Sequence, residues 1–180
     1  MNQRAVFLDR DGILNHAVIR NGKPYPPSSV AEVEIPPGVA DCLVQLKHHG
    51  FLLIGVTNQP DVARGATLRG TVDAINRLLK SKLPLDDIFV CFHDDADGCF
   101  CRKPYPGLIL DAATHYGVNV MTSYMVGDRW KDIEAGKRAG CITVWVNYSY
   151  AEDFRTGLPD YICNSAADAF QWILSKELIK

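Results

Sequence analysis

The 180-residue chain lacks an apolar run long enough to span a membrane, and it has no excess of either charge. Its 19 basic and 21 acidic side chains give a formal net charge of −2, so no broad positive surface for nucleic acid or anionic lipid is expected. The first residues lead straight into a strand-like segment, which argues against a secretory signal. Repeats, low-complexity tracts and linkers are also lacking. We therefore expect one domain over residues 1–180, a cytoplasmic monomer without a nucleic-acid or membrane partner.

Short apolar runs alternate with segments of helical periodicity. The runs, which predict buried strands, cover residues 5–8, 51–56, 88–90, 123–126 and 142–146. Helical stripes follow in residues 39–46, in 68–79 with Thr67 as the predicted N-cap, in 130–139, and in 170–178. This alternation predicts an α/β fold with three layers, a Rossmann-like, doubly wound and mostly parallel sheet covered by helices on both faces.

The segment from Ile19 to Pro37 differs from the rest because it contains five prolines and no clear period. Proline lacks the amide donor that regular structure needs, so an ordered or semi-ordered loop is expected here. The segment directly follows the first acidic motif, where it could wall a site.

Two acidic clusters each follow a predicted strand. Asp9 and Asp11, with Gly12 after them, come after the first run, and Asp128 and Asp132 come after the fourth. Because open α/β sheets place ligands at the carboxyl ends of their strands, these side chains are expected to share one crevice. Gathered carboxylates repel one another unless a cation joins them, and oxygen ligands favour magnesium. The alternative is that each aspartate only caps a turn or a helix.

Two further strand ends carry groups that suit phosphate. Thr57 and Asn58 offer a hydroxyl and an amide after the second run, and Arg102 and Lys103 place two cations after the third. A phosphoryl group in transfer carries negative charge that such donors stabilise. Taken singly, Thr57 could be an ordinary turn residue and Lys103 a surface charge.

Three of the six cysteines gather in one short stretch. Cys91 and His93 form one arm and Cys99 and Cys101 the other, a set of four ligands that suits a tetrahedral structural zinc. In a reducing compartment clustered cysteines favour metal binding over disulfides. The alternative is three reduced surface cysteines beside an unrelated histidine. The remaining cysteines are expected to pack as small core residues, namely Cys42, Cys141 and Cys163.

Taken in order, Asp9-x-Asp11-Gly12, Thr57-Asn58, Lys103 and Gly127-Asp128 resemble the four motifs of haloacid dehalogenase-like phosphatases. The resemblance implies that Asp9 is a nucleophile that forms an aspartyl-phosphate, and that Asp11 is the general acid and base. Thr57 and Lys103 would hold the phosphoryl group. Magnesium would lie between Asp9, the main-chain carbonyl of Asp11 and Asp128, with Asp132 in support.

The two cysteine arms narrow the resemblance. Cys-x-His followed by Cys-x-Cys-Arg-Lys-Pro is similar to the zinc-containing branch of D-glycero-D-manno-heptose 1,7-bisphosphate phosphatases and histidinol-phosphate phosphatases. This branch lacks a large cap domain, so a capless fold with a zinc-binding loop is implied. It also implies substrate binding by Asn58 and by Arg102 beside Lys103. A small phosphorylated metabolite is the expected partner, with Mg²⁺ as the catalytic and Zn²⁺ as the structural cofactor.

Among substrates, D-glycero-D-manno-heptose 1,7-bisphosphate, cleaved at position 7, is the best candidate by resemblance. The alternatives are a histidinol-phosphate phosphatase, a polynucleotide 3′-phosphatase and a non-catalytic, zinc-stabilised scaffold. The chain departs from the branch at Pro60-Asp61, where Ser-Gly is usual. These two residues lie near where the substrate body should rest. Tyr148 and Tyr150 could line a pocket, but packing is their expected role.

Overall fold

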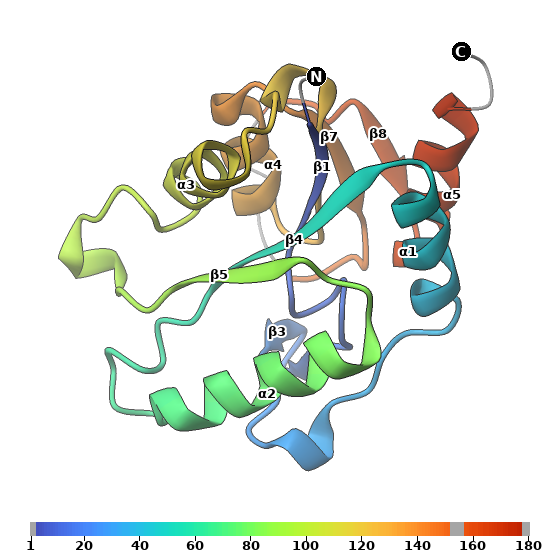
Figure 1. Ribbon diagram of the computed structural model, residues 1–180. Coiled ribbons are helices and arrows are strands. Elements are labelled where there is room, and N and C mark those ends of the chain that lie inside the picture. Colours follow the sequence, from blue (N-terminus) through green and yellow to red (C-terminus); the bar gives the residue numbers. More distant parts are fainter. Residues whose placement is uncertain (1–2, 152–156, 178–180) are drawn as a thin grey trace.

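The computed structural model describes residues 3–151 and 157–177 and is built on a six-stranded sheet (Figure 1). The sheet has the order β5-β4-β1-β6-β7-β8, and every neighbouring pair is parallel. Its strands are β1 (Arg4–Leu8), β4 (Phe51–Asn58), β5 (Asp87–Cys91), β6 (Tyr124–Gly127), β7 (Ile142–Val146) and β8 (Tyr161–Cys163). The predicted parallel α/β sheet is therefore confirmed.

Helices cover both faces of this sheet. One layer comprises α1 (Val39–His48), α2 (Arg69–Lys82) and α5 (Ala166–Glu177), and the other comprises α3 (Gly107–Tyr116) and α4 (Trp130–Ala139). Short 3₁₀ turns complete the list: η1 (Val30–Glu32), η2 (Asp95–Asp97) and η3 (Val120–Thr122). The three predicted layers are present.

The central strand β1 shows why its sequence is continuously apolar. Val6 and Leu8 point into the core under α1, α2 and α5, whereas Ala5 and Phe7 point into the core under α3 and α4. All four side chains are fully buried. An alternating pattern would have signalled one solvated face, so the apolar run correctly indicated a strand covered on both sides.

The order of the strands gathers the polar motifs of the sequence at one place. From β1 the chain adds β4 and then β5 on one side, and it later returns to place β6 on the other side of β1. Such a reversal is a topological switch point, where the loops at the carboxyl ends of adjacent strands diverge and leave a crevice. The loops after β1, β4, β5 and β6 all reach this crevice.

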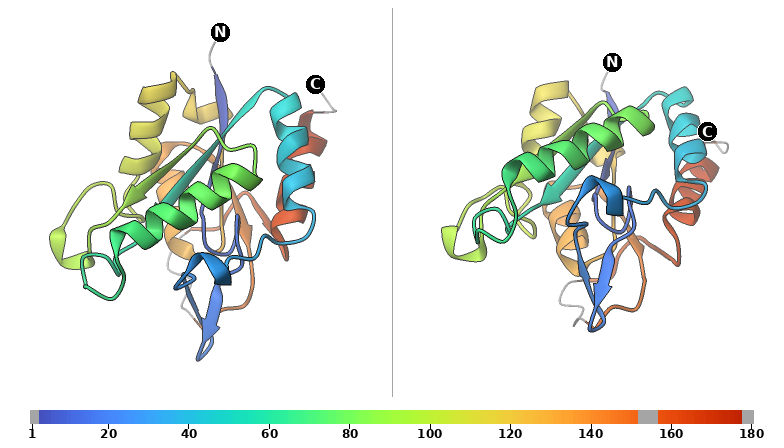
Figure 2. Two further views of the ribbon diagram at one scale, coloured as in Figure 1. Left: turned by 60° about the horizontal axis from the view of Figure 1, so that its bottom comes forward. Right: turned by 90° about the horizontal axis from the view of Figure 1, so that it is seen from below.

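The proline-rich segment contains a β-hairpin, so the prediction of a loop over Ile19–Pro37 was partly wrong. Its strands are β2 (Val18–Arg20) and β3 (Lys23–Tyr25), joined at Asn21 and Gly22. Both turn residues have positive φ, 52° and 72°, as a type I′ turn requires. The Asn-Gly pair was the signal for this turn. The hairpin lies beyond the end of β1 (Figure 2), and residues of β3 line the crevice.

Other differences from the predictions concern element ends. Thr67 is not the N-cap of α2, because its amide donates to the carbonyl of Asp61 in the preceding turn, and Leu68 occupies the cap position without a side-chain bond. Leu68 is 77% exposed and so lies outside the buried stripe. The three-residue strand β8 was not predicted. Leu178, expected in the last helix, lies outside the described residues.

The buried cysteines and the surface agree with the sequence. Cys42, Cys141 and Cys163 are buried and unpaired, as predicted. Among the described residues we found no helix with the length and apolarity needed to cross a bilayer. Between β1 and α1 the chain forms the β2–β3 hairpin and η1, and between β4 and β5 it forms α2, which agrees with a capless arrangement.

Two glycines test the packing of the helix layers. A Cβ added to Gly136 in α4 would lie 2.7 Å from Met125 Cβ and 2.9 Å from Thr143 Cγ2, whereas one added to Gly70 in α2 would meet nothing within 4 Å. We therefore expect Gly136→Ala to lower the free energy of unfolding by about 1–3 kcal/mol through overpacking. Gly70→Ala should raise it by about 0.5 kcal/mol through helix propensity. Urea titrations followed by fluorescence would contradict this packing if both variants shifted stability in the same direction.

Candidate active site and metal sites

The site is organised around the buried ammonium group of Lys103. Its Nζ lies 2.6 Å from Asp9 Oδ1, 2.7 Å from Asp132 Oδ1 and 2.6 Å from the carbonyl oxygen of Val56. Lys103 is only 2% exposed. Burial alone would lower the pKa of this amine, but the charges of Asp132 and Asp9 outweigh burial and hold the pKa above its ordinary value. Lys103 is therefore a permanent cation that joins the loops after β1, β4 and β5 to α4.

Three buried carboxylates gather at this point, and two of them, Asp9 and Asp132, contact the ammonium group. Oxygens of Asp9, Asp128 and Asp132 lie within 4.8 Å of one another. Burial, and then the neighbouring carboxylates, raise the pKa of Asp9 to about 6 even though Lys103 opposes the shift. Burial and the charges of Asp9 and Asp132 likewise raise the pKa of Asp128. The cluster thus carries more negative charge than Lys103 neutralises.

This cluster fits a divalent cation. Asp128 Oδ1 is buried and has no hydrogen-bond partner among the residues that the structure describes. A buried carboxylate oxygen without a partner costs free energy, and a hard cation would both ligate it and relieve the repulsion between the carboxylates. Gly12, with a φ of 101°, passes so close to the Asp128 carboxylate that any side chain there would collide with it. The donor set and the excess charge both match Mg²⁺.

Asp11 lies beside this cluster rather than in it. Its carboxylate accepts two hydrogen bonds from the Arg10 guanidinium (3.1 and 2.9 Å), one from Asn15 (3.0 Å) and one from Gln59 (2.8 Å). Arg10 is completely buried and also donates to Asn76 in α2. These bonds hold the Asp11 side chain at the wall of the crevice and leave its main chain next to Asp9.

The two residues at the end of β4 have different positions. Thr57 is buried, lines the pocket and accepts a hydrogen bond from Gln59 (2.9 Å). Asn58 exchanges two hydrogen bonds with the main chain of Lys103: its amide nitrogen donates to the Lys103 carbonyl (2.9 Å), and its oxygen accepts from the Lys103 N–H (3.1 Å). Substrate binding by Asn58 stays a prediction; in this structure its amide positions Lys103.

An open pocket of about 230 Å³ lies over Asp9 and Lys103. One wall is the β2–β3 hairpin, with Lys23, Pro24, Tyr25 and Pro26, and the opposite wall is the turn after β4. The remaining lining residues are Asp11, Thr57, Asn58, Pro60, Asp61, Arg64, Arg129, Lys131 and Asp132. The pocket is thus rimmed by basic side chains and floored by carboxylates.

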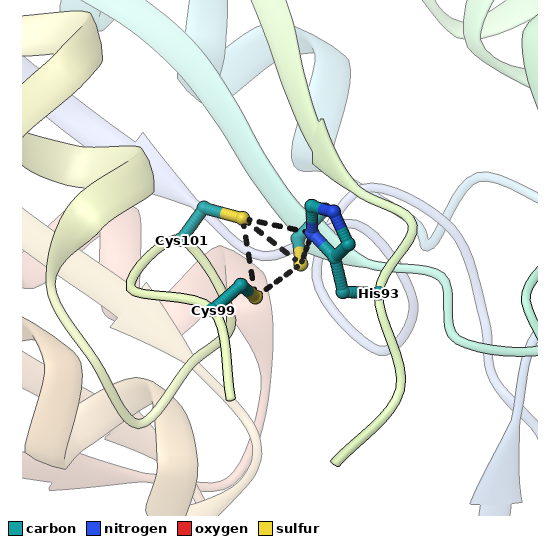
Figure 3. A group of neighbouring side chains, drawn as sticks. His93, Cys99 and Cys101 are labelled. Atoms are coloured by element: carbon teal, nitrogen blue, oxygen red, sulfur yellow. Dashed lines mark hydrogen bonds between the residues drawn. The ribbon is translucent and has the colours of Figure 1, made fainter. Parts of the chain in front are cut away.

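The predicted zinc ligands converge at the end of β5 (Figure 3). The three sulfur atoms of Cys91, Cys99 and Cys101 lie 3.3–3.7 Å apart, and His93 Nδ1 lies 3.3 Å from Cys101 Sγ and 3.6 Å from Cys91 Sγ. A tetrahedral zinc with Zn–S bonds of about 2.3 Å would separate its sulfurs by roughly 3.8 Å. The four donors therefore suit a structural zinc and leave no open position.

Arg102 and Arg64 are both paired with the loop between the two cysteine arms. Arg102 donates to Asp95 Oδ1 (2.8 Å) and to the His93 carbonyl (3.3 Å), and it is not among the described residues that line the pocket. Arg64 forms an ion pair with Asp94. Substrate binding by Arg102 stays a prediction, and in this structure the residue links the cysteine loop to Lys103.

Three aromatic residues in and after β7 contact the site, and no local pattern in the sequence indicated these contacts. Trp145 Nε1 donates to the Asp128 carbonyl (3.0 Å). The Tyr148 hydroxyl donates to the Gly12 carbonyl (3.1 Å), and the Tyr150 hydroxyl donates to Asp128 Oδ2 (2.8 Å). Packing was the expected role of both tyrosines, but each makes a polar contact with an acidic motif.

Comparisons with known proteins agree with this geometry. A family model described as HAD-hydrolase-like matches residues 100–169. D-glycero-β-D-manno-heptose-1,7-bisphosphate 7-phosphatase of Escherichia coli (strain K12) is 32% identical over 95% of this chain and 88% of its own length. The enzyme of the same name from Pasteurella multocida (strain Pm70) is 33% identical over 92% of this chain and 94% of its own length.

A solved structure of a protein with a related name is also similar to this chain. The crystal structure of D,D-heptose 1,7-bisphosphate phosphatase from B. bronchiseptica, complexed with magnesium and phosphate, matches with a TM-score of 0.80. The two chains are 30% identical, and the match covers 97% of this chain and 99% of the other.

A doubly wound sheet whose four strand ends carry Asp9, Thr57, Lys103 and Asp128 defines a hydrolase of the haloacid dehalogenase-like class. The similarity over nearly the whole chain narrows the assignment from this class to one family. The chain belongs to the haloacid dehalogenase-like phosphatases, in the family of the heptose 1,7-bisphosphate 7-phosphatases.

The contact between Asn58 and Lys103 can be tested without a substrate. Asn58→Ala would leave the half-buried N–H and carbonyl of Lys103 without partners, so we expect the free energy of unfolding to fall by about 2–3 kcal/mol. Asn58→Asp keeps the acceptor but turns a carboxylate oxygen toward the Lys103 carbonyl, so it should also lower the free energy of unfolding. Thermal unfolding of both variants measures this. Equal and negligible losses would show that the amide does not hold Lys103.

Proposed function

We propose that this chain is a Mg²⁺-dependent phosphatase that hydrolyses a phosphomonoester of a small sugar metabolite through an aspartyl-phosphate on Asp9. The best candidate substrate is D-glycero-D-manno-heptose 1,7-bisphosphate, cleaved at position 7, because relatives that match nearly the whole chain carry that name. The observation that carries the proposal is the contact between Asp9 and Lys103 at the floor of the pocket.

The geometry supports Asp9 as the nucleophile. Its carboxylate lies at the pocket floor, where burial would favour protonation and Lys103 favours the charged form. In the first step an Asp9 oxygen would bond to phosphorus while the bond from phosphorus to the substrate oxygen breaks. Lys103 Nζ and the Thr57 hydroxyl would then hold the phosphoryl oxygens, because both lie at the same strand ends.

Asp11 is the candidate general acid and base. It would give a proton to the departing sugar oxygen, and it would then take one from the water that attacks phosphorus and breaks the bond to Asp9. The products would be inorganic phosphate, the dephosphorylated sugar and the restored Asp9 carboxylate. Asp11 lines the pocket, and Gln59, which donates to both Asp11 and Thr57, fixes the two side chains relative to one another.

The acidic cluster would hold the magnesium ion. Asp9, Asp128 and the main-chain carbonyl of Asp11 are the candidate ligands, and Asp132 supports them through Lys103. When bound, Mg²⁺ supplies positive charge to the phosphoryl oxygens. Without it, the excess negative charge on these carboxylates would repel a phosphate.

The pocket rim supports a substrate with a second anionic group. Lys23 on the hairpin and Arg64 on the turn after β4 both line the pocket that contains Asp9. A monophosphate bound to Lys103 would leave Lys23 facing solvent, whereas a bisphosphate would bring its second phosphate toward Lys23 and toward Arg64, whose guanidinium forms ion pairs with Asp94 and Asp61. This arrangement favours a sugar bisphosphate over histidinol phosphate, which carries an ammonium group in place of a second phosphate.

Phosphate release from a panel of substrates tests the proposal. The panel comprises both anomers of the heptose bisphosphate, histidinol phosphate and a 3′-phosphorylated oligonucleotide, each with and without Mg²⁺. We expect kcat/KM to be highest for a heptose bisphosphate, and Asp9→Asn to lower kcat by about 10⁴-fold or more. Asp73→Asn, the same change at a half-exposed position on α2, serves as the control and should retain full activity.

The outcomes separate the alternatives. A preference for histidinol phosphate or for the oligonucleotide would contradict the proposed substrate but would not contradict the proposed mechanism. Hydrolysis that Asp9→Asn leaves intact would contradict the mechanism. If neither these substrates nor generic phosphomonoesters are hydrolysed with both metals supplied, the non-catalytic scaffold is the alternative that remains.

We also propose that Cys91, His93, Cys99 and Cys101 hold one structural Zn²⁺. Its role would be to fix the loop that leads into Lys103, because Cys101 is only two residues away from it in sequence. The loop is also tied to α3, since the Gly107 amide donates to the Phe100 carbonyl (3.1 Å). Zinc binding would therefore contribute to folding and would position the catalytic lysine.

Removing a zinc ligand should be costly. We expect Cys99→Ala to reduce the zinc content from about one per chain to near zero, and to lower the free energy of unfolding by more than about 2 kcal/mol. Elemental analysis and chemical denaturation measure the two effects. Cys42→Ala, a buried cysteine of α1 outside the cluster, is the matched control and should keep its zinc. A wild-type chain that binds no zinc with its thiols reduced would refute the site.

A further inference from the structure

The loop that follows β7 is anchored at both ends next to the acidic cluster. The Asn147 amide donates to the Cys163 carbonyl of β8 (2.8 Å), and the Ala151 amide donates to the Gly22 carbonyl at the tip of the β2–β3 hairpin (2.9 Å). Between these anchors, the Ser149 amide donates to Asn147 Oδ1 (2.9 Å). The side chains of this short loop therefore have little freedom to move relative to the site.

Tyr150 uses this fixed position to contact Asp128. Its hydroxyl donates to Asp128 Oδ2 at 2.8 Å, while Asp128 Oδ1 has no partner among the described residues. The main-chain carbonyl of Asp128 is fixed separately by Trp145 Nε1. The two carboxylate oxygens thus differ: one is occupied by a hydroxyl donor, and the other is left for a ligand.

Packing restricts the same carboxylate from a second side. The main chain at Gly12 approaches the Asp128 carboxylate so closely that a Cβ there would overlap it, and Tyr148 donates to the Gly12 carbonyl (3.1 Å). Asp128 is only 2% exposed, so water has no ready access to replace a lost donor.

We propose that Tyr150 is a positioning residue of the metal site, whose hydroxyl orients the Asp128 carboxylate so that Oδ1 is presented to the divalent cation. The proposal rests on the proposed function, because it takes Asp128 as a metal ligand. Hydrogen-bond partners of this kind orient metal ligands, and their loss typically costs about 10–100-fold in metal affinity or activity. Tyr150 makes no contact with the reacting atoms in this scheme, so its effect should appear in metal affinity.

Binding of Mn²⁺ to the zinc-loaded protein, followed by the electron paramagnetic resonance signal of free Mn²⁺, tests this without a substrate. We expect Tyr150→Phe to raise the Mn²⁺ dissociation constant by about tenfold. In the activity assay the variant should need correspondingly more Mg²⁺, while kcat at saturating Mg²⁺ stays within about twofold of wild type. The split between metal requirement and kcat distinguishes positioning of a ligand from a general loss of structure.

Tyr148→Phe is the matched control. It removes a hydroxyl bond from the same loop, but this bond goes to a main-chain carbonyl rather than to a carboxylate, so the Mn²⁺ affinity should change by less than about twofold. The proposal is overturned if Tyr150→Phe binds Mn²⁺ as tightly as the wild type, or if both tyrosine variants weaken binding equally.

Asp128→Asn separates this proposal from the one on which it depends. If wild type binds Mn²⁺ and Asp128→Asn does not, the metal site stands, and the Tyr150→Phe result judges the positioning role alone. If Asp128→Asn binds Mn²⁺ as wild type does, Asp128 is not a ligand, and both the metal site and the role of Tyr150 fall.

Discussion

One interaction on which the rest of the site depends is the buried contact of the Lys103 ammonium with Asp9 and Asp132. Removing a cation and two anions from water is expensive, and a single lysine cannot neutralise three carboxylates. The remaining negative charge is what a bound divalent cation would balance, and the same cation would offset the negative charge of a phosphoryl group. An arrangement that costs stability when no cation is bound is thus suited to bind a metal together with an anion.

The position of Lys103 is maintained by hydrogen bonds to its main chain and by contacts of the residues just before it. Asn58, at the end of β4, exchanges two hydrogen bonds with the lysine's peptide groups, and the cysteine cluster fixes the chain two residues earlier. Arg102, adjacent to Lys103, is tied to Asp95 in the same loop. The cysteine loop and the active site therefore form one connected unit, so a metal bound by the four donors would affect catalysis without touching the substrate.

The sequence was most informative where the signal is local. Continuous apolar runs revealed the five longest strands of the sheet, and short-range spacing revealed the acidic motifs and the cluster of three cysteines and one histidine. Features that depend on distant contacts were missed. Asn58 and Lys103 are 45 residues apart, and Tyr150 and Asp128 are 22 apart. Strand β8 has only three residues, too few for a periodic pattern, and its pairing with β7 decides its structure.

The central claim is that Asp9 carries the phosphoryl group during turnover, and direct detection of that intermediate tests it. Acid quenching of the Mg²⁺-loaded enzyme within milliseconds of mixing with ³²P-labelled heptose bisphosphate should trap a phosphorylated protein. We expect the label to be released by hydroxylamine, as an acyl phosphate is, and to map to the peptide that contains Asp9. Full turnover without any hydroxylamine-labile label at Asp9 would contradict the account, because the phosphate would then pass directly to water.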